Sequence, residues 1–191
     1  MPSGEPASPF PPFLPHFGAP VSVPRSFSLD QIREAMTSLG AAGLAIPPPS
    51  FTTMNTEVVD YRPGDAETNL GAVLTVRIPN DERWHNPMGL MQGGALGMAV
   101  DNAIGPLSYL VAPPSSTTQL ALTYIAPVTP DLDAVTVEAT FAHRAGRQLV
   151  FDAEVRGPDG TVLTVARATN RIVRRPASGE ETSGPARRPA G

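Results

Sequence analysis

The segment from Trp84 to Tyr109 constrains the fold more strongly than any other part of the chain. It begins as a loop with a proline and a glycine, passes through a Gly-Gly pair, and continues as an apolar stretch long enough for a helix. Asp101 is the only formally charged side chain between Arg83 and Asp131. Because an ionised carboxylate is costly to bury unless it is paired, Asp101 either satisfies a structural contact or serves chemistry.

The composition excludes several classes of function. The 191 residues carry a net charge of −4, which provides no basic surface for nucleic acid. The chain contains no cysteine, so a thiol nucleophile, a disulfide and a cysteine-based metal site are excluded. Three scattered histidines do not form a metal-binding pattern. We therefore expect no nucleic-acid partner and no metal.

Nothing in the sequence predicts export or a membrane partner. The N-terminus lacks the basic start and apolar core of a signal peptide. No apolar run approaches the roughly 20 residues that a membrane-spanning helix requires. We therefore expect a cytoplasmic protein.

Both ends of the chain are rich in proline. Residues 1–25 contain eight prolines, whose missing amide donors predict a disordered arm. Residues 26–50 combine a capped helix that begins at Ser28 with a proline-rich linker. The segment 174–191 is rich in proline, glycine and charge, and we expect a disordered tail there.

The remaining residues, 51–173, form one domain in which apolar residues alternate along strand-like runs. These runs are Thr53–Tyr61, Leu70–Ile78, Thr117–Ala126, Ala134–Ala142, Gln148–Arg156 and Thr161–Val173. The pattern predicts an α+β fold in which the apolar helix lies across a curved antiparallel sheet and the last four strands form a meander. Pro106, which follows Gly105, is expected to kink or end this helix.

Gln92, Gly93 and Gly94 occupy the predicted start of the helix. Amides in the first turn of a helix have no internal acceptor and carry the positive end of the helix dipole. Glycine allows a ligand to approach those amides closely, so the segment is suited to polarise a carbonyl group or hold an oxyanion. It remains equally open that the glycines only permit close packing of the helix on the sheet.

Gly93 and Asp101 are too far apart to act on one atom within a single chain. Their separation of eight residues corresponds to about 12 Å along the helix axis and about 80° around it. If both groups act, the simplest solution is a dimer with antiparallel helices, in which one chain supplies the amide and the other supplies the acid. The sequence thus leads to the hypothesis that chemistry at Asp101 requires dimerisation.

Several residues around the helix are spaced as in a known signature. They are Asn86, Gly89, Gln92, Gly93, Gly94, Asp101, Thr117 and the pair Tyr124-x-x-Pro127. The pattern resembles that of the hotdog-fold acyl-CoA thioesterases of the phenylacetate-pathway (PaaI) type. The resemblance extends over roughly Thr53–Val173. The resemblance implies one long helix wrapped by a strongly curved antiparallel sheet, in homodimers that pair into homotetramers. It also implies hydrolysis of acyl-CoA to a free acid and coenzyme A without a cofactor.

The resemblance further implies a role for each matching residue. Asp101 would be the general base or the nucleophile, and the Gly93 amide would polarise the thioester oxygen. Asn86 would position the water or the carbonyl from the partner subunit, and Thr117 would orient the water or Asp101. Gln92 stands where the family often has histidine, and glutamine forms hydrogen bonds but cannot carry a proton.

A basic turn formed by Arg144, Gly146 and Arg147 is a second candidate for substrate binding, together with Gly94. In the family, such a turn lies near the nucleotide end of coenzyme A, where arginine pairs well with phosphate. A solvated surface turn explains the same residues equally well.

Two alternative functions remain open at the level of sequence. One is a non-catalytic acyl-CoA-binding or regulatory module, although a protein that only binds its ligand has little reason to keep a lone acid in an apolar helix. The other is an acyl-thioester hydratase or dehydratase, which pairs a histidine with an acid. Because no histidine occurs on the predicted helix near Asp101, thioester hydrolysis is the favoured function. The sequence does not specify the acyl group.

Overall fold

The computed structural model describes residue 34 and residues 47–173. The predicted arm at 1–25 and the predicted tail at 174–191 lie outside the described residues. Of the predicted helix that begins at Ser28, only Glu34 is described, in helical conformation. Within the described residues, no helix is long and apolar enough to cross a membrane.

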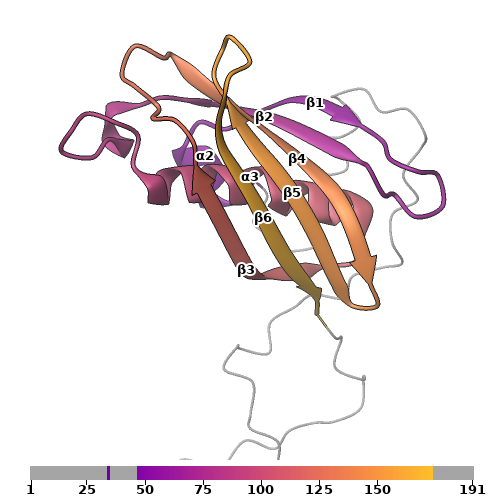
Figure 1. Ribbon diagram of the computed structural model, residues 1–191. Helices are drawn as coiled ribbons and strands as arrows, with labels where there is room; N and C mark the ends of the chain where they lie inside the picture. The colour runs from indigo at the N-terminus through magenta and orange to yellow at the C-terminus, as the bar shows by residue number, and fades with distance from the viewer. Residues whose placement is uncertain (1–33, 35–46, 174–191) are drawn as a thin grey trace, which may run out of the picture.

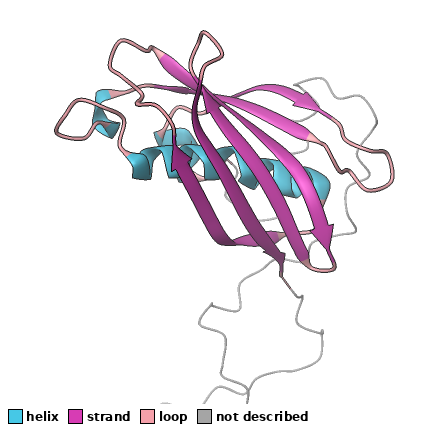
Figure 2. Cartoon of the chain, in the orientation of Figure 1, coloured by secondary structure: helices cyan, strands magenta, loops and turns pink. Residues whose placement is uncertain are grey.

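The described chain forms a six-stranded antiparallel sheet with one long helix lying along one of its faces (Figures 1 and 2). The predicted α+β layout, with a long helix against a curved antiparallel sheet, is confirmed. In chain order the elements are α2 (Pro49–Thr53), β1 (Glu57–Arg62), β2 (Val73–Pro79), the 3-10 helix η1 (Glu82–Trp84), α3 (Gly93–Val111), β3 (Ser115–Tyr124), β4 (Ala134–Ala145), β5 (Gln148–Arg156) and β6 (Val162–Ile172).

The order of the strands differs from the predicted meander. The sheet runs β1-β2-β4-β5-β6-β3, so β3 lies at an edge beside β6, and β4 pairs with β2 instead of β3. The expectation of four consecutive neighbours is therefore wrong for β3. The reason is that α3 has 19 residues, about 28 Å of helix, and carries the chain across the sheet from β2 to the opposite edge.

The hydrophobic core lies between α3 and the face of the sheet that the helix covers. Each central strand contributes alternate residues, as the period of two predicts. The rings of Phe141 on β4 and Phe151 on β5 lie 5.3 Å apart, centroid to centroid. The other fully buried core residues of β2, β5 and α3 include Leu74, Val76, Ile78, Leu149, Val155, Ala99, Val100, Ala103, Ile104 and Leu107.

The segment before β1 differs from the sequence prediction. Residues Pro49–Thr53 form the short helix α2, and β1 begins only at Glu57, so the strand predicted from Thr53 starts too early. Proline is well suited to the first position of a helix, because the amide it lacks would have no acceptor there. Phe51 of α2 is buried against the core and fixes this short helix in place.

The helix α3 does not end at Pro106. It continues to Val111, and the side chains of Leu107, Leu110 and Val111 are buried. Of the two predicted effects of Pro106, a kink or an end of the helix, the end is therefore wrong. Proline removes one intrahelical hydrogen bond, but the residues that follow it bury apolar surface, at about 25 cal/mol per Å². That burial favours continuation of the helix.

Candidate active site

A tight loop leads into α3 and is closed by the side chain of Asn86. The Asn86 Oδ1 accepts hydrogen bonds from the amides of Met88, at 2.9 Å, and Leu90, at 3.2 Å. Gly89 lies at φ +77°, in the left-handed region that favours glycine, and its amide donates to the Asn86 carbonyl. Within the described residues, the side-chain hydrogen bonds of Asn86 all use Oδ1. Its Nδ2 is therefore the group that can donate to a ligand.

The two glycines at the start of α3 have different surroundings. The Tyr124 hydroxyl donates to the Gly93 carbonyl at 2.9 Å, and a Cβ atom at Gly93 would lie only 2.7 Å from the Tyr124 Oη. A Cβ atom at Gly94, by contrast, would meet no atom within 4 Å. Packing thus explains the glycine at Gly93, whereas at Gly94 the helix start opens toward solvent.

Gln92 is the N-cap residue of α3, but its side chain makes no capping hydrogen bond. Its backbone is extended, with φ −68° and ψ 141°, and its amide donates to the Trp84 carbonyl at 2.7 Å. The side chain is exposed beside the start of the helix. The geometry therefore leaves Gln92 free to bond a ligand or the neighbouring loop.

A groove of about 400 Å³ lies over the start of α3. Its apolar walls include Tyr124 and Ile125, which are 54% and 58% exposed. The lining residues are Asn86, Leu90, Met91, Gly93, Leu96, Tyr124, Ile125, Ala126, Pro127 and Val128. The groove is therefore lined by apolar side chains together with Asn86 and Gly93, the first residue of α3.

Asp101 and Thr117 form a second polar pair. The Thr117 Oγ1 donates to the Asp101 Oδ1 at 3.1 Å. Asp101 is exposed on the described chain, so its carboxylate is not buried among the apolar residues of the helix. The structure thus brings these two predicted residues together, on the side of α3 that faces β3.

The two halves of the predicted site remain apart within one chain. Asp101 and Thr117 do not line the groove that contains Gly93 and Asn86. Because α3 is continuous from Gly93 to Val111, the separation of about 12 Å along its axis holds. Within one described chain, the Asp101–Thr117 pair therefore lies apart from Gly93 and Asn86.

Asn102, the neighbour of Asp101, was not among the predicted site residues. It is buried, accepts a hydrogen bond at Oδ1 from the Ser50 hydroxyl at 3.0 Å, and donates from Nδ2 to Thr56 Oγ1 at 3.1 Å. These bonds tie α2 and the segment after it to the middle of α3. The sequence signal for Asn102 was a polar residue next to Asp101 within a largely apolar helix.

The basic turn between β4 and β5 lies outside the groove. Both the Nε and the Nη2 of Arg147 donate to the Ile172 carbonyl, at 3.1 and 2.7 Å, and so hold the end of β6. The exposed Arg144 donates from Nε to the Gly146 carbonyl at 3.3 Å. Of these two predicted phosphate-binding arginines, Arg147 is thus engaged with the backbone and Arg144 is the more accessible.

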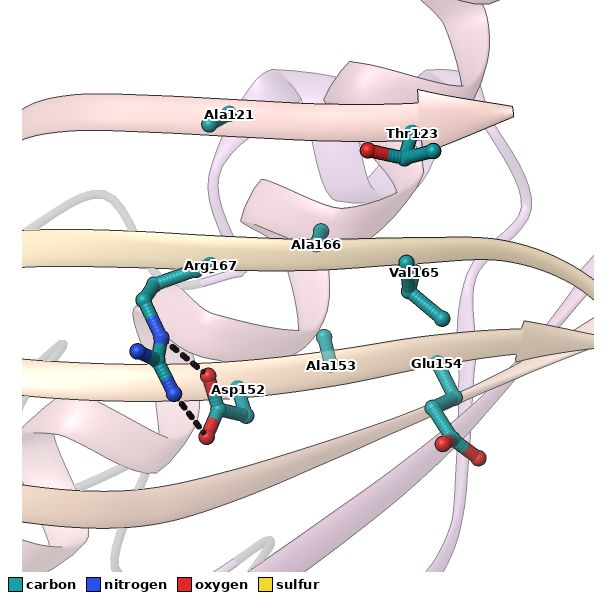
Figure 3. A pocket seen from close by; sticks show the side chains of 8 residues that line it. All are labelled: Ala121, Thr123, Asp152, Ala153, Glu154, Val165, Ala166 and Arg167. Carbon is teal, nitrogen blue, oxygen red and sulfur yellow. Dashed lines mark hydrogen bonds and ion pairs between the residues drawn. The ribbon is translucent and has the colours of Figure 1, made fainter. Parts of the chain in front are cut away.

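A second hollow, of about 420 Å³, lies on the face of the sheet opposite α3 (Figure 3). Arg167 crosses it with two hydrogen bonds to Asp152, at 2.7 and 2.9 Å, which raise the pKa of the guanidinium. None of the predicted site residues lines this hollow. Within residue 34 and residues 47–173, no group of three or more histidine, aspartate or glutamate side chains is placed to hold a metal ion.

Comparison with known proteins identifies the fold. No protein-family model matches the chain, and no curated protein matches it. The PaaI protein of the Escherichia coli phenylacetic acid degradation operon superposes with a TM-score of 0.62 at 13% identity, over 77% of this chain and 97% of that chain. The chain has the hotdog fold.

Two further hotdog structures are similar over most of their length. The conserved protein PA5202 from Pseudomonas aeruginosa is 26% identical, with a TM-score of 0.57, over 74% of this chain and 98% of that chain. A hypothetical thioesterase protein from Streptococcus pneumoniae, with coenzyme A, is 18% identical, with a TM-score of 0.56, over 76% and 97%.

The hypothetical thioesterase protein from Streptococcus pneumoniae also has structures with single alanine replacements. One replaces an aspartate and another replaces a threonine, and the two positions are 16 residues apart. These structures are 19% identical to this chain, with TM-scores of 0.55. Asp101 and Thr117, which are hydrogen-bonded here, have the same separation of 16 residues.

Proposed function

We propose that this hotdog protein hydrolyses an acyl-CoA thioester to a free acid and coenzyme A. The observation that carries the proposal is the hydrogen bond between Thr117 and Asp101, the one acid of α3. The thioesterase protein from Streptococcus pneumoniae has the same fold, was solved with coenzyme A, and has an aspartate and a threonine with the same spacing.

In the proposed reaction, Asp101 takes a proton from a water molecule whose oxygen attacks the carbonyl carbon of the thioester. The Gly93 amide, at the positive end of α3, donates to the oxygen that becomes negatively charged. The carbon–sulfur bond then breaks, and its electron pair leaves with the sulfur of coenzyme A. Thr117 orients Asp101, and the Asn86 Nδ2 is placed to hold the carbonyl or the water.

A nucleophilic role for Asp101 is the alternative route to the same products. The carboxylate would attack the carbonyl carbon, release the thiolate, and form an anhydride that water then hydrolyses. Single turnover in ¹⁸O-labelled water can establish the nucleophilic route. Label in the Asp101 carboxylate requires an anhydride that is hydrolysed at the carbon of Asp101, whereas label in the acid product alone is common to general-base hydrolysis and to anhydride hydrolysis at the acyl carbon.

The exposed edge of β3 supports a dimeric form of the site. Among the described residues, this ten-residue strand pairs with β6 on one side only, and most of its residues are exposed. Natural sheets rarely leave so long an edge uncovered. Pairing of two β3 strands about a twofold axis would set the two α3 helices antiparallel. Gly93 and Asn86 of one chain would then act with Asp101 and Thr117 of the other, and two such dimers would form the proposed tetramer.

Thiol release from a panel of acyl-CoA substrates tests the proposal. We expect Asp101→Asn and Asp101→Ala to lower kcat about 10²- to 10⁴-fold, the usual contribution of a general base. Asp152→Asn is the matched control, because Asp152 is a half-exposed aspartate on the opposite face of the sheet, where it pairs with Arg167. Release at the wild-type rate from both Asp101 variants would refute the role of Asp101.

A non-catalytic module that binds acyl-CoA is the second candidate. Gln92 favours it, because it replaces the residue that can carry a proton in many members of the family. Calorimetric titration with coenzyme A distinguishes the two functions. Binding without thiol release from any acyl-CoA would establish the binding module and exclude the hydrolase.

A further inference from the structure

Two buried polar atoms beside Thr117 have no hydrogen-bond partner in the part of the chain that the structure describes. They are the Oδ1 of Asn170 on β6 and the Oγ of Ser115 on β3. Asn170 is only 2% exposed. A buried amide normally finds a partner, because an unpaired polar group loses its hydration without compensation.

The register of the sheet places the side chains of Asn170 and Ser115 next to that of Thr117. Thr117 pairs directly with Asn170, and Ser115 pairs with the next inward-facing residue of β6, Ile172. Opposite side chains in an antiparallel pair have Cβ atoms about 5 Å apart. Asn170 and Ser115 are thus neighbours of the hydroxyl that donates to Asp101.

The hydrogen-bonding capacity of the group matches a water molecule. An amide oxygen only accepts, and the Thr117 hydroxyl, whose proton points to Asp101, can accept one further bond. The Ser115 hydroxyl can donate. A water molecule supplies two donors and accepts in return, and buried waters typically have about three polar partners. Within the group, no side chain forms a direct hydrogen bond with the Asn170 Oδ1 or the Ser115 Oγ.

We propose that Asn170 and Ser115 hold an ordered water molecule behind Thr117. The water donates to Asn170 Oδ1 and to Thr117 Oγ1, and it accepts from Ser115 Oγ. Since the water donates to Thr117 Oγ1, the threonine does not donate to the water, and its proton stays directed at Asp101. Asn170 is thus a positioning residue that acts through Thr117. This inference rests on the proposed hydrolysis at Asp101.

The test compares Asn170→Leu with Thr117→Val in the thiol-release assay. We expect Asn170→Leu to lower kcat about fivefold to tenfold, the effect of one hydrogen bond, with KM unchanged. Because Asn170 acts through Thr117, the double variant should be no slower than Thr117→Val alone. Thr164→Val is the matched control, since Thr164 lies on the same strand and its buried Oγ1 also has no hydrogen-bond partner within the described residues. Its kcat should equal that of the wild type.

The possible outcomes separate the two proposals. An active wild type with a fully active Asn170→Leu variant, or with additive losses in the double variant, overturns the water site alone. A wild type inactive on every acyl-CoA overturns the proposed hydrolysis and, with it, the role of Asn170. If circular dichroism shows that Asn170→Leu does not fold, Ser115→Ala decides, because it removes the third partner and should lower kcat without adding to Thr117→Val.

Discussion

At the scale of single residues, Gly93 offers a way to test one backbone amide. The preceding residue, Gln92, has φ −68° and ψ 141°, a conformation compatible with a following proline. Proline is also tolerated at the first position of a helix. Gly93→Pro therefore removes the proposed oxyanion donor while it preserves the helix start.

We expect Gly93→Pro to have a kcat about 10²- to 10³-fold below that of Gly93→Ala, the usual effect of one oxyanion donor. The alanine variant is the matched control, because both substitutions add the Cβ atom that crowds Tyr124 and only proline removes the N–H group. The measurement is steady-state thiol release, after circular dichroism has confirmed folding. Equal rates in the two variants would show that the Gly93 amide is not the donor.

The sequence predicts part of this site but not the rest. The spacing of Gly93 and Asp101 on one helix is sufficient to predict that the two groups stay apart, because helix geometry is fixed. The contact between Tyr124 and Gly93 depends on which strand lies beside the helix start. The position of the Asn170 Oδ1, which has no hydrogen-bond partner among the described residues, depends on the register of β6 with β3. Neither the neighbouring strand nor the register is encoded in local periodicity.

At the scale of elements, Asn102 links α2 to α3. Its side chain bonds both Ser50 and Thr56 across more than 40 positions of sequence. We expect Asn102→Ala to lower the free energy of unfolding by about 1–3 kcal/mol, because it removes two bonds and leaves the hydroxyl partners unpaired. Urea unfolding measures the change. Ser50→Ala, which removes one of the two bonds, should have the smaller effect, and the reverse order would contradict the link.

The 3-10 helix η1, just before the groove, depends on an ionised carboxylate. Hydrogen bonds from the Arg83 side chain and amide lower the pKa of Asp81 from 3.8 to about 2. A lowered pKa means that the charged form stabilises the fold. This stabilisation is complete well above pH 3.8 and is lost as the pH falls through about 2.

We therefore expect Asp81→Asn to be less stable than the wild type at pH 6, with a difference that shrinks steadily toward pH 2. Urea midpoints of both proteins, measured across this range, provide the check. The other carboxylates are common to both proteins and cancel in the difference. A gap that is constant with pH would show that the charge of Asp81 does not contribute.

Local pattern predicts the elements better than it predicts their arrangement. Alternation of Leu74, Val76 and Ile78 is sufficient to predict β2, and the apolar run is sufficient to predict α3, because burial of one face requires those periods. The position of β3 beside β6 depends on how far α3 carries the chain. The five residues of α2 are too few to give a period, and burial of Phe51 decides their conformation.

At the scale of the whole molecule, the divided site predicts complementation between inactive chains. In a mixed dimer of Asp101→Asn and Gly93→Pro chains, one site combines an intact amide with an intact acid, and the other site has neither. With random exchange, about half of the dimers are mixed, and the mixture should recover about a quarter of the wild-type activity. Thiol release before and after subunit exchange measures the recovery.

A second mixture provides the control for complementation. Chains with Asp101→Asn and chains with Thr117→Val are altered in the same half of the site, so their mixed dimers contain no intact site. We expect no recovery from that pair. If native mass spectrometry shows mixed dimers and neither mixture recovers activity, the site is not shared between chains.

The bulge in β3 determines which side of the sheet Thr117 faces. Thr117 pairs with Asn170 and Gln119 pairs with Thr169, so Thr118 is an extra residue on its strand. Because of that extra residue, Ser115 and Thr117 lie on the same side of the sheet as Leu120 and Leu122, whereas a regular strand of the same length would turn them to the other side. Loss of the bulge with no change in length would thus separate Thr117 from Asp101 without changing either side chain. The irregular pairing of β3 with β6 therefore matters to the chemistry as directly as the identity of residue 117.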